Sequence, residues 1–393
     1  MPELDKSASV EVDLGNYTFD GADAPDLPDL SQVSETDRQQ LRMAGVDVDE
    51  VDRSGTFLQF DQSRVHCRAS NPDVEILGIE AALERYQGLP DYYWKALDPD
   101  KDDFTRQTAK EVHGGYFIRT KKGAVIPHPV QSCLYIKGKD VAQAVHNVVV
   151  VEEDSDVHII TGCATAHGVQ SALHLGISEF YVKKNGRLTF TMVHNWGEQV
   201  AVRPRTAVHV EENGVFVSNY ILLKPVRTVQ SYPAVYLNGP GGLARFNSVI
   251  VAPEGSHVDT GNKIILNAPN TRGEIISKTI TTGGTIIARG FIGGNAVPAR
   301  GHLECKGLIL GQGVIHAIPE LVGSVPGVEL SHEAAVGKIA REEIEYLMAR
   351  GLDEEEATST IVRGFLNVDI MGLPRELQES IEKTIHESEK DMF

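Results

Sequence analysis

The pattern of hydrophobic and polar residues changes twice along the chain and divides it into three parts. In the first part, residues 36–45, 75–88 and 105–113 are typical of short helices that alternate with charged segments. Stop signals, a glycine and a proline, follow the second of these segments directly. We therefore expect an N-terminal region of helical or mixed structure over residues 1–110.

Helical periodicity disappears between about Gly114 and Gly323, where β-branched runs alternate with glycine, asparagine, aspartate and proline. Strand lengths of about five or six residues and a repeat of roughly 20 residues favour a solenoid of the parallel β-helix type. The strand pattern alone leaves a sandwich equally open, because Asn-Gly pairs at three positions allow hairpins: Asn185, Asn213 and Asn238. We assign residues 111–325 to this β core.

The third part, residues 326–393, returns to a helical pattern. A first helix is predicted from about His332 to Arg350, and Gly351 stands where a left-handed residue commonly ends a helix. Asp353 and Glu356 match a capping box at the start of a second helix. Pro374 would open a third helix at its first position. These features predict a small C-terminal helical module.

Composition and charge exclude several classes of protein. The 393-residue chain has a net charge of -18, which argues against a nucleic-acid binder. No apolar run approaches the ~20 residues that span a bilayer. The N-terminal segment lacks the apolar core of a signal peptide. We therefore expect a cytoplasmic protein that has no membrane segment.

The four cysteines are widely spaced and form no C-x-x-C motif, which excludes a zinc ribbon and a thioredoxin-type site. Alternation along a strand places Leu303 and Cys305 on one face, so Cys305 is either interior filling or a thiol at a shared surface. Cys163 follows Gly162 at an expected strand end, where it could be exposed and reactive. Filling of a small apolar space is the simpler interpretation of each cysteine.

Two further motifs fail on their context. Residues 239–244 match the spacing G-x-G-x-x-A, but a strand follows where a dinucleotide site requires a helix, and the chain contains no P-loop. His332 and Glu333 begin like the zinc-protease motif H-E-x-x-H, but Val336 stands where the second histidine is required. Glu333 would instead interact favourably with the positive end of the expected helix.

The run from the cysteine strand to the second expected helix resembles the SufB/SufD family, whose members form the scaffold of the Suf iron–sulfur cluster assembly machine. The likeness rests on Cys305, on His316 and Pro319, on the H-E-A sequence at His332, and on a later Gly-Phe pair. It extends over roughly residues 110–390. The resemblance implies a right-handed parallel β-helix between helical ends.

Within that family the residues are similar to SufB rather than SufD, because SufD-like chains carry H-G-A where this chain has His332-Glu333-Ala334. The resemblance implies that Cys305, His332 and Glu333 are ligands of a transient iron–sulfur cluster. One chain offers too few ligands for a cluster, so a second copy in a homodimer, or a SufD paralogue, would complete the set. A mixed ligand set should also hold the cluster less tightly than four cysteines.

The resemblance also assigns a route for sulfur. Cys163 is similar to the residue that receives sulfur from a donor, and the interior near His194 and Trp196 is similar to the path of onward transfer. SufB chains often read Q-N-W where this chain reads His194-Asn195-Trp196.

A non-enzymatic scaffold of this kind would use ATP only through SufC, the ABC-type ATPase of the system. We expect the C-terminal module to bind SufC, with Gly351, Gly364 and Phe365 at the contact, unless Phe365 simply packs the module onto the solenoid. Two alternatives stay open: a SufD-like structural subunit without cluster chemistry, and a carbohydrate-active β-helix enzyme. The latter would need a secretory signal and a carboxylate-rich cleft.

Overall fold

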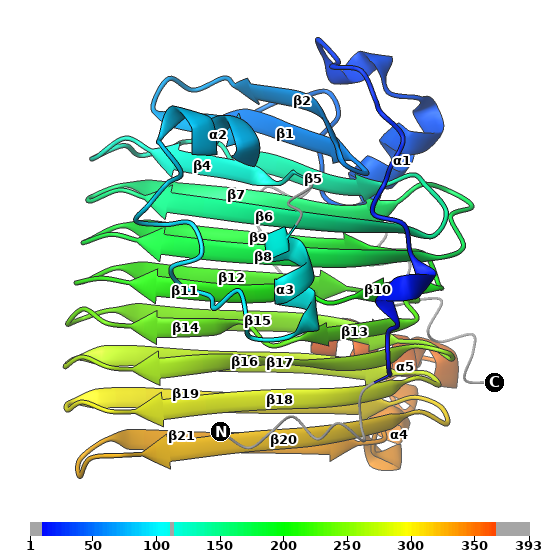
Figure 1. The fold of residues 1–393 in the computed structure, drawn as a ribbon. Helices are drawn as coiled ribbons and strands as arrows, with labels where there is room; N and C mark the ends of the chain where they lie inside the picture. The colour runs from blue at the N-terminus through cyan, green and yellow to red at the C-terminus, as the bar shows by residue number, and fades with distance from the viewer. Residues whose placement is uncertain (1–9, 111–113, 367–393) are drawn as a thin grey trace.

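The computed structural model describes residues 10–110 and 114–366. Two sheets face each other in a parallel β-solenoid of about eight turns (Figure 1). In spatial order the first sheet contains β2 (Ser63–Ala69), β1 (Gly55–Phe60), β5 (Val130–Ile136), β7 (Asp156–Thr165), β9 (Arg187–Asn195), β12 (Val215–Leu222), β15 (Leu243–Ala252), β17 (Thr271–Thr281), β19 (Ala299–Ile309) and β21 (Glu329–Gly337).

The second sheet is built from the strands that alternate with these along the chain. It contains β3 (Val74–Gly78), β4 (Tyr116–Thr120), β6 (Val141–Val151), β8 (Ala172–Val182), β10 (Val200–Val202), β11 (Arg205–Val210), β13 (Thr228–Ser231), β14 (Ala234–Leu237), β16 (His257–Leu266), β18 (Thr285–Gly294) and β20 (Val314–Gly323). The described helices are η2 (Leu14–Asn16), η3 (Leu30–Gln32), α1 (Glu35–Met43), α2 (Ile79–Arg85), α3 (Asp103–Lys110), α4 (Arg341–Met348) and α5 (Glu354–Leu366).

Parallel pairing between successive turns confirms the β-helix and rules out the sandwich. Register partners in successive turns lie 27 to 31 residues apart, as for Thr271 with Ala299 and Val141 with Ala172. The expected repeat of roughly 20 residues was therefore wrong, because each full turn passes through both sheets. The Asn-Gly pairs form corners instead of hairpins, and Asn213 donates to the Asn185 side chain of the preceding turn at 3.2 Å.

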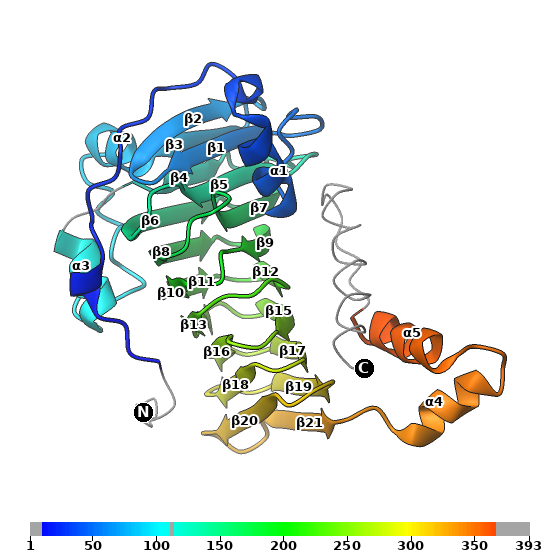
Figure 2. The same ribbon diagram turned by 90° about the vertical axis from the view of Figure 1, so that its right-hand side faces the viewer.

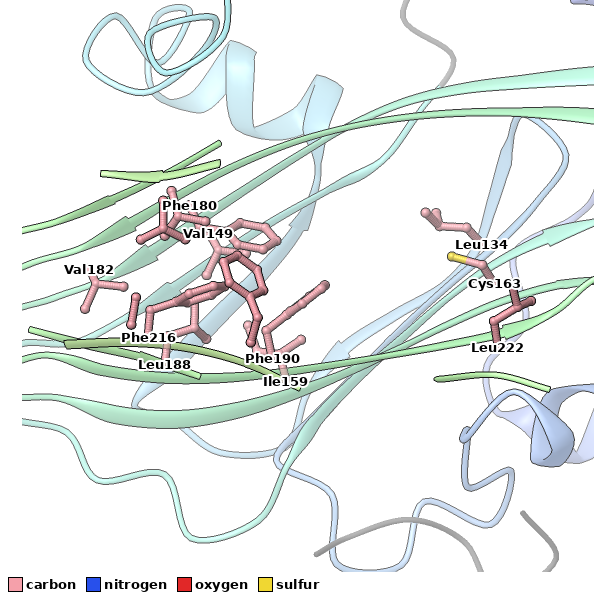
Figure 3. Close-up of a cluster of buried hydrophobic side chains, with 14 of the residues drawn as sticks. Leu134, Val149, Ile159, Cys163, Phe180, Val182, Leu188, Phe190, Phe216 and Leu222 are labelled. Atoms are coloured by element: carbon pink, nitrogen blue, oxygen red, sulfur yellow. The ribbon is translucent and has the colours of Figure 1, made fainter. Parts of the chain in front are cut away.

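The interior between the sheets is filled by apolar side chains that alternate along every strand. Phe180 packs against Phe190 with ring centroids 4.7 Å apart, and Phe216 continues the stack toward Phe246. Figure 3 shows this phenylalanine cluster apart from a second group made by Leu134, Cys163 and Leu222. The solenoid therefore has a packed core into which inward side chains from successive turns are stacked in register.

The structure corrects two of the expected helices. Residues 332–350 do not form one helix, because Glu329–Gly337 is strand β21 and the helix α4 begins only at Arg341. Residues 75–88 begin as strand β3 and become helical only at Ile79. In both places, pairing with a neighbouring strand overrides the local helical pattern.

Other local predictions are confirmed. Helix α1 (Glu35–Met43) and helix α3 (Asp103–Lys110) form where helices are expected, at residues 36–45 and 105–113, of which residues 111–113 are outside the described part. Gly351 has a φ of 101°. The capping box is formed, with the Asp353 N–H donating to Glu356 at 3.0 Å and the Glu356 N–H donating to Asp353 at 2.8 Å.

The helix expected at Pro374 lies outside the described residues. The solenoid sheets also take strands from both flanking regions, namely β1 to β3 and β21, so the three-part division of the chain stays a prediction. Among the described helices, none is both long and apolar enough to cross a membrane.

Helices cover the outer face of the first sheet in two places, α1 near the N-terminal end and α5 over the middle strands (Figure 2). At one end Leu41 and Ala44, in and just after α1, pack with Cys133 and Tyr135 of β5. Farther along the sheet Val362 of α5 is fully buried in an outer apolar cluster with residues of the middle strands β9, β12, β15 and β17: Val193, Ile221, Val249, Val251 and Ile280.

Candidate functional site

Cys163 lies inside the solenoid, two residues before the end of β7. Its side chain is 0 % exposed, and its register partners are Leu134 of β5 and His194 of β9. Burial raises the pKa of the Cys163 thiol far above its ordinary value. The structure therefore contradicts an exposed position for this cysteine, and the thiol is protonated in the closed fold.

Leu134, Cys163 and His194 form one inward row, which we call the Cys163 row. It contains one of the two expected path residues, His194, and the other, Trp196, follows two residues later in the chain. Burial, and to a lesser extent the nearby His174, lowers the pKa of His194 to about 3, so the ring is neutral. Its Nδ1 lies 3.0 Å from the Tyr220 hydroxyl. The Trp196 ring lies 5.1 Å from His174 and 5.4 Å from His194, centroid to centroid.

Trp196 carries an unsatisfied donor in this cluster. Its side chain is 4 % exposed, and its Nε1 atom is buried without a hydrogen-bond partner among the described residues. A buried donor without an acceptor is costly, on the order of 1–3 kcal/mol. The indole N–H is therefore available to a group that enters the interior next to the Cys163 row.

A second inward row connects this region to Cys305. In register from β7 to β19 it consists of Thr161, Met192, Tyr220, Ser248, Ser277 and Cys305. Most of these side chains carry a hydroxyl or a sulfur in an otherwise apolar interior, and Asn262 from the opposite sheet donates to Ser248 at 3.4 Å. Sequence analysis missed this row because its members stand about one solenoid turn apart and only the register aligns them.

An internal cavity of about 40 Å³ lies along this row, lined by Met192, Tyr220 and the phenylalanine cluster. Pro204 and Pro233 also line it, at points where the second sheet is interrupted between β10 and β11 and between β13 and β14. Proline cannot donate a ladder hydrogen bond, so it is placed at such breaks. The volume exceeds the ~10–15 Å³ that one water molecule needs.

Cys305 points inward from β19 and is 3 % exposed. Burial raises its pKa to about 11, with a smaller contribution from the adjacent Glu304. On the neighbouring strand β21, His332 is aligned with Leu303 and Ala334 with Cys305. His332 therefore shares the inward face with Cys305, but it is exposed because no further turn within residues 10–110 and 114–366 covers it.

Glu333 lies on the opposite, outward face of β21. It is aligned with Glu304, which forms an ion pair with Lys306 at 2.9 Å. The structure thus brings Cys305 and His332 to one face and separates Glu333 from both. Within residues 10–110 and 114–366, no group of three or more histidine, cysteine, aspartate or glutamate side chains could hold a metal ion.

The last turn of the solenoid is open. Strand β21 pairs only with β19, and β20 pairs only with β18, among the strands that the structure describes. Val314, Val322 and Val336 on these two strands are 55 %, 46 % and 41 % exposed. Unpaired strand edges that carry apolar side chains are ready to pair with another chain.

The residues expected to bind a partner ATPase occupy the α4–α5 module. Gly351 forms the turn between the two helices, and Gly364 is exposed on α5. Phe365 is half-buried and packs against the outer apolar cluster that contains Val362. This contact is the one expected if Phe365 holds the module on the solenoid, and Tyr346 on α4 is the exposed aromatic of the module, at 59 %.

Comparison with known proteins gives consistent matches. The family model described as "SUF system FeS cluster assembly, SufBD core domain" matches residues 134–365. An iron-sulfur cluster assembly SufBD family protein of Archaeoglobus fulgidus is 52 % identical over 358 residues, covering 91 % of this chain and 96 % of the relative. A Methanothermobacter thermautotrophicus protein of the same description is 44 % identical and covers 97 % and 95 %. Bacillus subtilis iron-sulfur cluster assembly protein SufB is 30 % identical and covers 84 % and 73 %.

Proposed function

Because this chain belongs to the SufBD family of iron–sulfur cluster assembly proteins, we propose that it is a SufB-like scaffold on which sulfur and iron are combined into a transient cluster. One observation carries the proposal. Cys163 and Cys305 both point into the same interior, and the in-register row from Thr161 to Ser277, with its cavity, lies between them.

Sulfur would arrive at Cys163 from a protein persulfide. The Cys163 sulfur attacks the outer sulfur of the donor, the donor's S–S bond breaks, and an S–S bond to Cys163 forms. The proton of the Cys163 thiol ends on the donor's thiolate, so no outside oxidant or reductant is needed. Because burial keeps the thiol protonated, the reaction requires either an opening of the site or a base.

The two imidazoles in the interior beside Cys163 are unprotonated, but they are too weakly basic to take this proton until an opening of the site raises their pKa. His174 and His194 both have their pKa lowered to about 3 by burial, so each presents an unprotonated ring at neutral pH. His174 Nδ1 lies 3.1 Å from Gln143 Oε1 and therefore donates to it, which leaves His174 Nε2 as an acceptor. Trp196 Nε1 supplies a donor for a sulfur anion in the same space.

The cluster would form at the open end of the solenoid. Cys305 and His332 face inward there and Glu333 outward, so one chain presents two ligands on one face and a third on the other. A second copy, or a SufD paralogue, paired along β20 and β21 would double this set. Thiolate and imidazole ligands suit iron, and carboxylate is a weaker partner that favours release.

ATP-driven change would reach this site through a SufC-type ATPase bound to the α4–α5 module. Helix α4 follows β21 after only a short connection, residues 338–340. A force applied to α4 is therefore transmitted directly to the strand that carries His332 and Glu333. Gly351, Gly364 and Phe365 stay the proposed contact residues of this module.

Anaerobic reconstitution tests the proposal. The protein is incubated with ferrous iron and sulfide, desalted, and examined by visible absorbance and Mössbauer spectroscopy. We expect a cluster in the wild type, none in Cys305→Ala, and wild-type content in Cys67→Ala, since Cys67 lies at the other end of the solenoid. A wild type without a cluster would instead indicate a SufD-like structural subunit.

A further inference from the structure

The closed fold shows no route by which a donor protein could reach the Cys163 thiol. The thiol is fully buried, and its outer side is closed too, because a side chain on Gly162 would lie 2.5 Å from the carbonyl oxygen of Ala44 after α1. A protein donor cannot reach this sulfur unless some element moves. Because Cys163 is close to the end of β7, the nearest elements that could move are the turns at this edge of the solenoid.

The turn that follows β7 differs from its neighbours. Residues 166–171 form a six-residue connection to β8, the longest of the turns from first-sheet to second-sheet strands in the described part of the solenoid. It is tethered at its ends, by the Ala166 N–H to Ile136 O at 2.8 Å and by the Asp140 N–H to Ser171 O at 2.7 Å. Between these tethers His167, Gly168 and Gln170 are exposed.

One residue of this turn is directed into the protein. Val169 packs against the interior cluster that contains both Cys163 and Trp196. The turn also rests on the next one, because a side chain on Gly197 would lie 2.9 Å from the Val169 carbonyl oxygen. Val169 therefore packs into the solenoid edge next to Gly197, the residue that follows Trp196, whose Nε1 has no partner among the described residues.

We propose that the segment Ala166–Ser171 is a lid over Cys163, and that it opens to admit the persulfide of a sulfur-donor protein. The inference rests on the proposed role of Cys163 as sulfur acceptor. Gly168, with a φ of 85° and no atom near its Cβ position, gives the middle of the lid the backbone freedom to move. The two tethered ends act as hinges.

Alkylation of the native protein measures the opening. The full-length protein is treated with iodoacetamide under native conditions, and modification of each cysteine is quantified by peptide mass spectrometry. Val169→Ala removes the part of the lid that packs into the interior, namely the two methyl groups of Val169. We therefore expect Cys163 to be alkylated at least about tenfold faster than in the wild type. Cys133, which is buried under α1 on the outer face of β5, serves as the internal reference and should not change.

A matched variant separates the lid from general loosening. Val226 is 1 % exposed in the same interior cluster and lies in the turn after β12. Val226→Ala removes the same two methyl groups from another turn of the same edge and should leave the Cys163 rate unchanged. Equal acceleration in both variants, or none in Val169→Ala, would overturn the lid.

A second variant reaches the same result by another route. Gly197→Ala introduces a methyl group at the Val169 carbonyl oxygen and should displace the lid without touching Val169 itself. Gly323→Ala, where nothing lies near the Cβ position, is its control. If Val169→Ala does not fold, as judged by its melting curve, an unchanged Cys163 rate in Gly197→Ala still contradicts the proposal.

The lid hypothesis and the proposed role of Cys163 as sulfur acceptor can be rejected independently of each other. Persulfide loading of Cys163 by a cysteine desulfurase, measured in the same variants, tests the acceptor. Faster alkylation without loading would exclude the acceptor role but retain the lid. Normal loading with unchanged alkylation in both lid variants would exclude the lid alone.

Discussion

The two ends of the solenoid are closed in different ways. At the N-terminal end the sheets finish in antiparallel pairs, β1 with β2 and β3 with β4, and α1 and α2 pack over them. At the C-terminal end β20 and β21 finish the described sheets without a further strand, and none of their residues is fully buried. A solenoid end normally needs a cap, and this end, uncapped among the described residues, is the surface where we propose that another chain pairs.

The two cysteines proposed to handle sulfur lie in these two settings. Cys163 belongs to the covered half and is sealed, whereas Cys305 lies in the last turn but one, beneath a strand whose inward residues are exposed. Burial raises the pKa of both thiols, but far more for Cys163 than for Cys305. The difference suits protected uptake at one end and exchange with iron at the other.

The largest effect is expected at the open end. Cys305→Ala should abolish cluster retention after reconstitution while the melting temperature changes little, because point substitutions typically cost about 1 kcal/mol. His332→Ala and Glu333→Ala should reduce cluster content less, since imidazole and carboxylate contribute less than thiolate to iron–sulfur binding. A normal cluster in Cys305→Ala would make this cysteine interior filling only.

The covered end is tested by the other cysteine. Cys163→Ser should block persulfide loading from a desulfurase and spare assembly from free sulfide, because free sulfide does not need an acceptor thiol. Loading is followed by a persulfide-specific label, and assembly by absorbance. If both activities fall together, Cys163 supports the fold or the cluster instead of receiving sulfur.

A charged side chain on the last turn should disrupt self-association through β20 and β21. Val322→Lys places a cation on the exposed face of β20 and should weaken self-association at least about tenfold, as measured by analytical ultracentrifugation. Val125→Lys is the matched control, because Val125 is 72 % exposed at the covered end and belongs to no named strand. Similar weakening by both substitutions would argue against a dimer through the last turn.

A substitution in the α4–α5 module should have a smaller effect, and it distinguishes two roles of Phe365, binding of SufC and packing of the module on the solenoid. Phe365→Ala should abolish pull-down of SufC with little change in melting if Phe365 is an interface anchor, since such anchors carry ~2 kcal/mol or more. Its contact with the cluster around Val362 predicts instead a lower melting temperature. Tyr346→Ala, at the exposed aromatic of α4, should leave melting unchanged in either case.

The smallest effect concerns the pH dependence of the covered end. The Glu50 carboxylate, whose Oε1 lies 3.4 Å from His66 Nε2, raises the pKa of His66 above 6.5, and the same contact lowers the pKa of Glu50 below 4.5. The pair therefore stabilises the fold most between these two values and loses this contribution as pH rises through the folded pKa of His66.

We expect the wild type to lose no more than about 2 °C of melting temperature between about pH 6 and pH 8.5 through this pair, because the cost of burying the charged His66 offsets much of its attraction to Glu50. His66→Gln should remove that part of the pH dependence. His128→Gln, at a half-exposed histidine 4.0 Å from Asp52, should not.

The strand pattern was sufficient for a β core but left a sandwich equally open, and the parallel β-helix was predicted only from the family resemblance. Glycine, asparagine and proline between β-branched runs indicated the strands, and capping residues located α5 to within a residue. The repeat length was wrong because strand length is set by pairing between distant turns. The apolar residues of β21 fit the period of a helix as well as that of a strand. Only the alignment of β21 with β19 decides for the strand.

The candidate site was predicted in its members but not in its arrangement. Cys163, Cys305, His332 and Glu333 follow from the resemblance, but which face each side chain occupies depends on strand register. A change of one residue in register would exchange His332 and Glu333. The polar row and the unpartnered Trp196 donor have no local signature, because burial alone makes them significant.

The central claim is that the cluster belongs to two chains joined at the open end. Sedimentation velocity of the anaerobically reconstituted protein, recorded both at the protein absorbance and at the cluster absorbance, tests it most directly. We predict that the cluster signal sediments only with the dimer, at one cluster for two chains, and disappears in Val322→Lys. A cluster that sediments with the monomer would contradict the account.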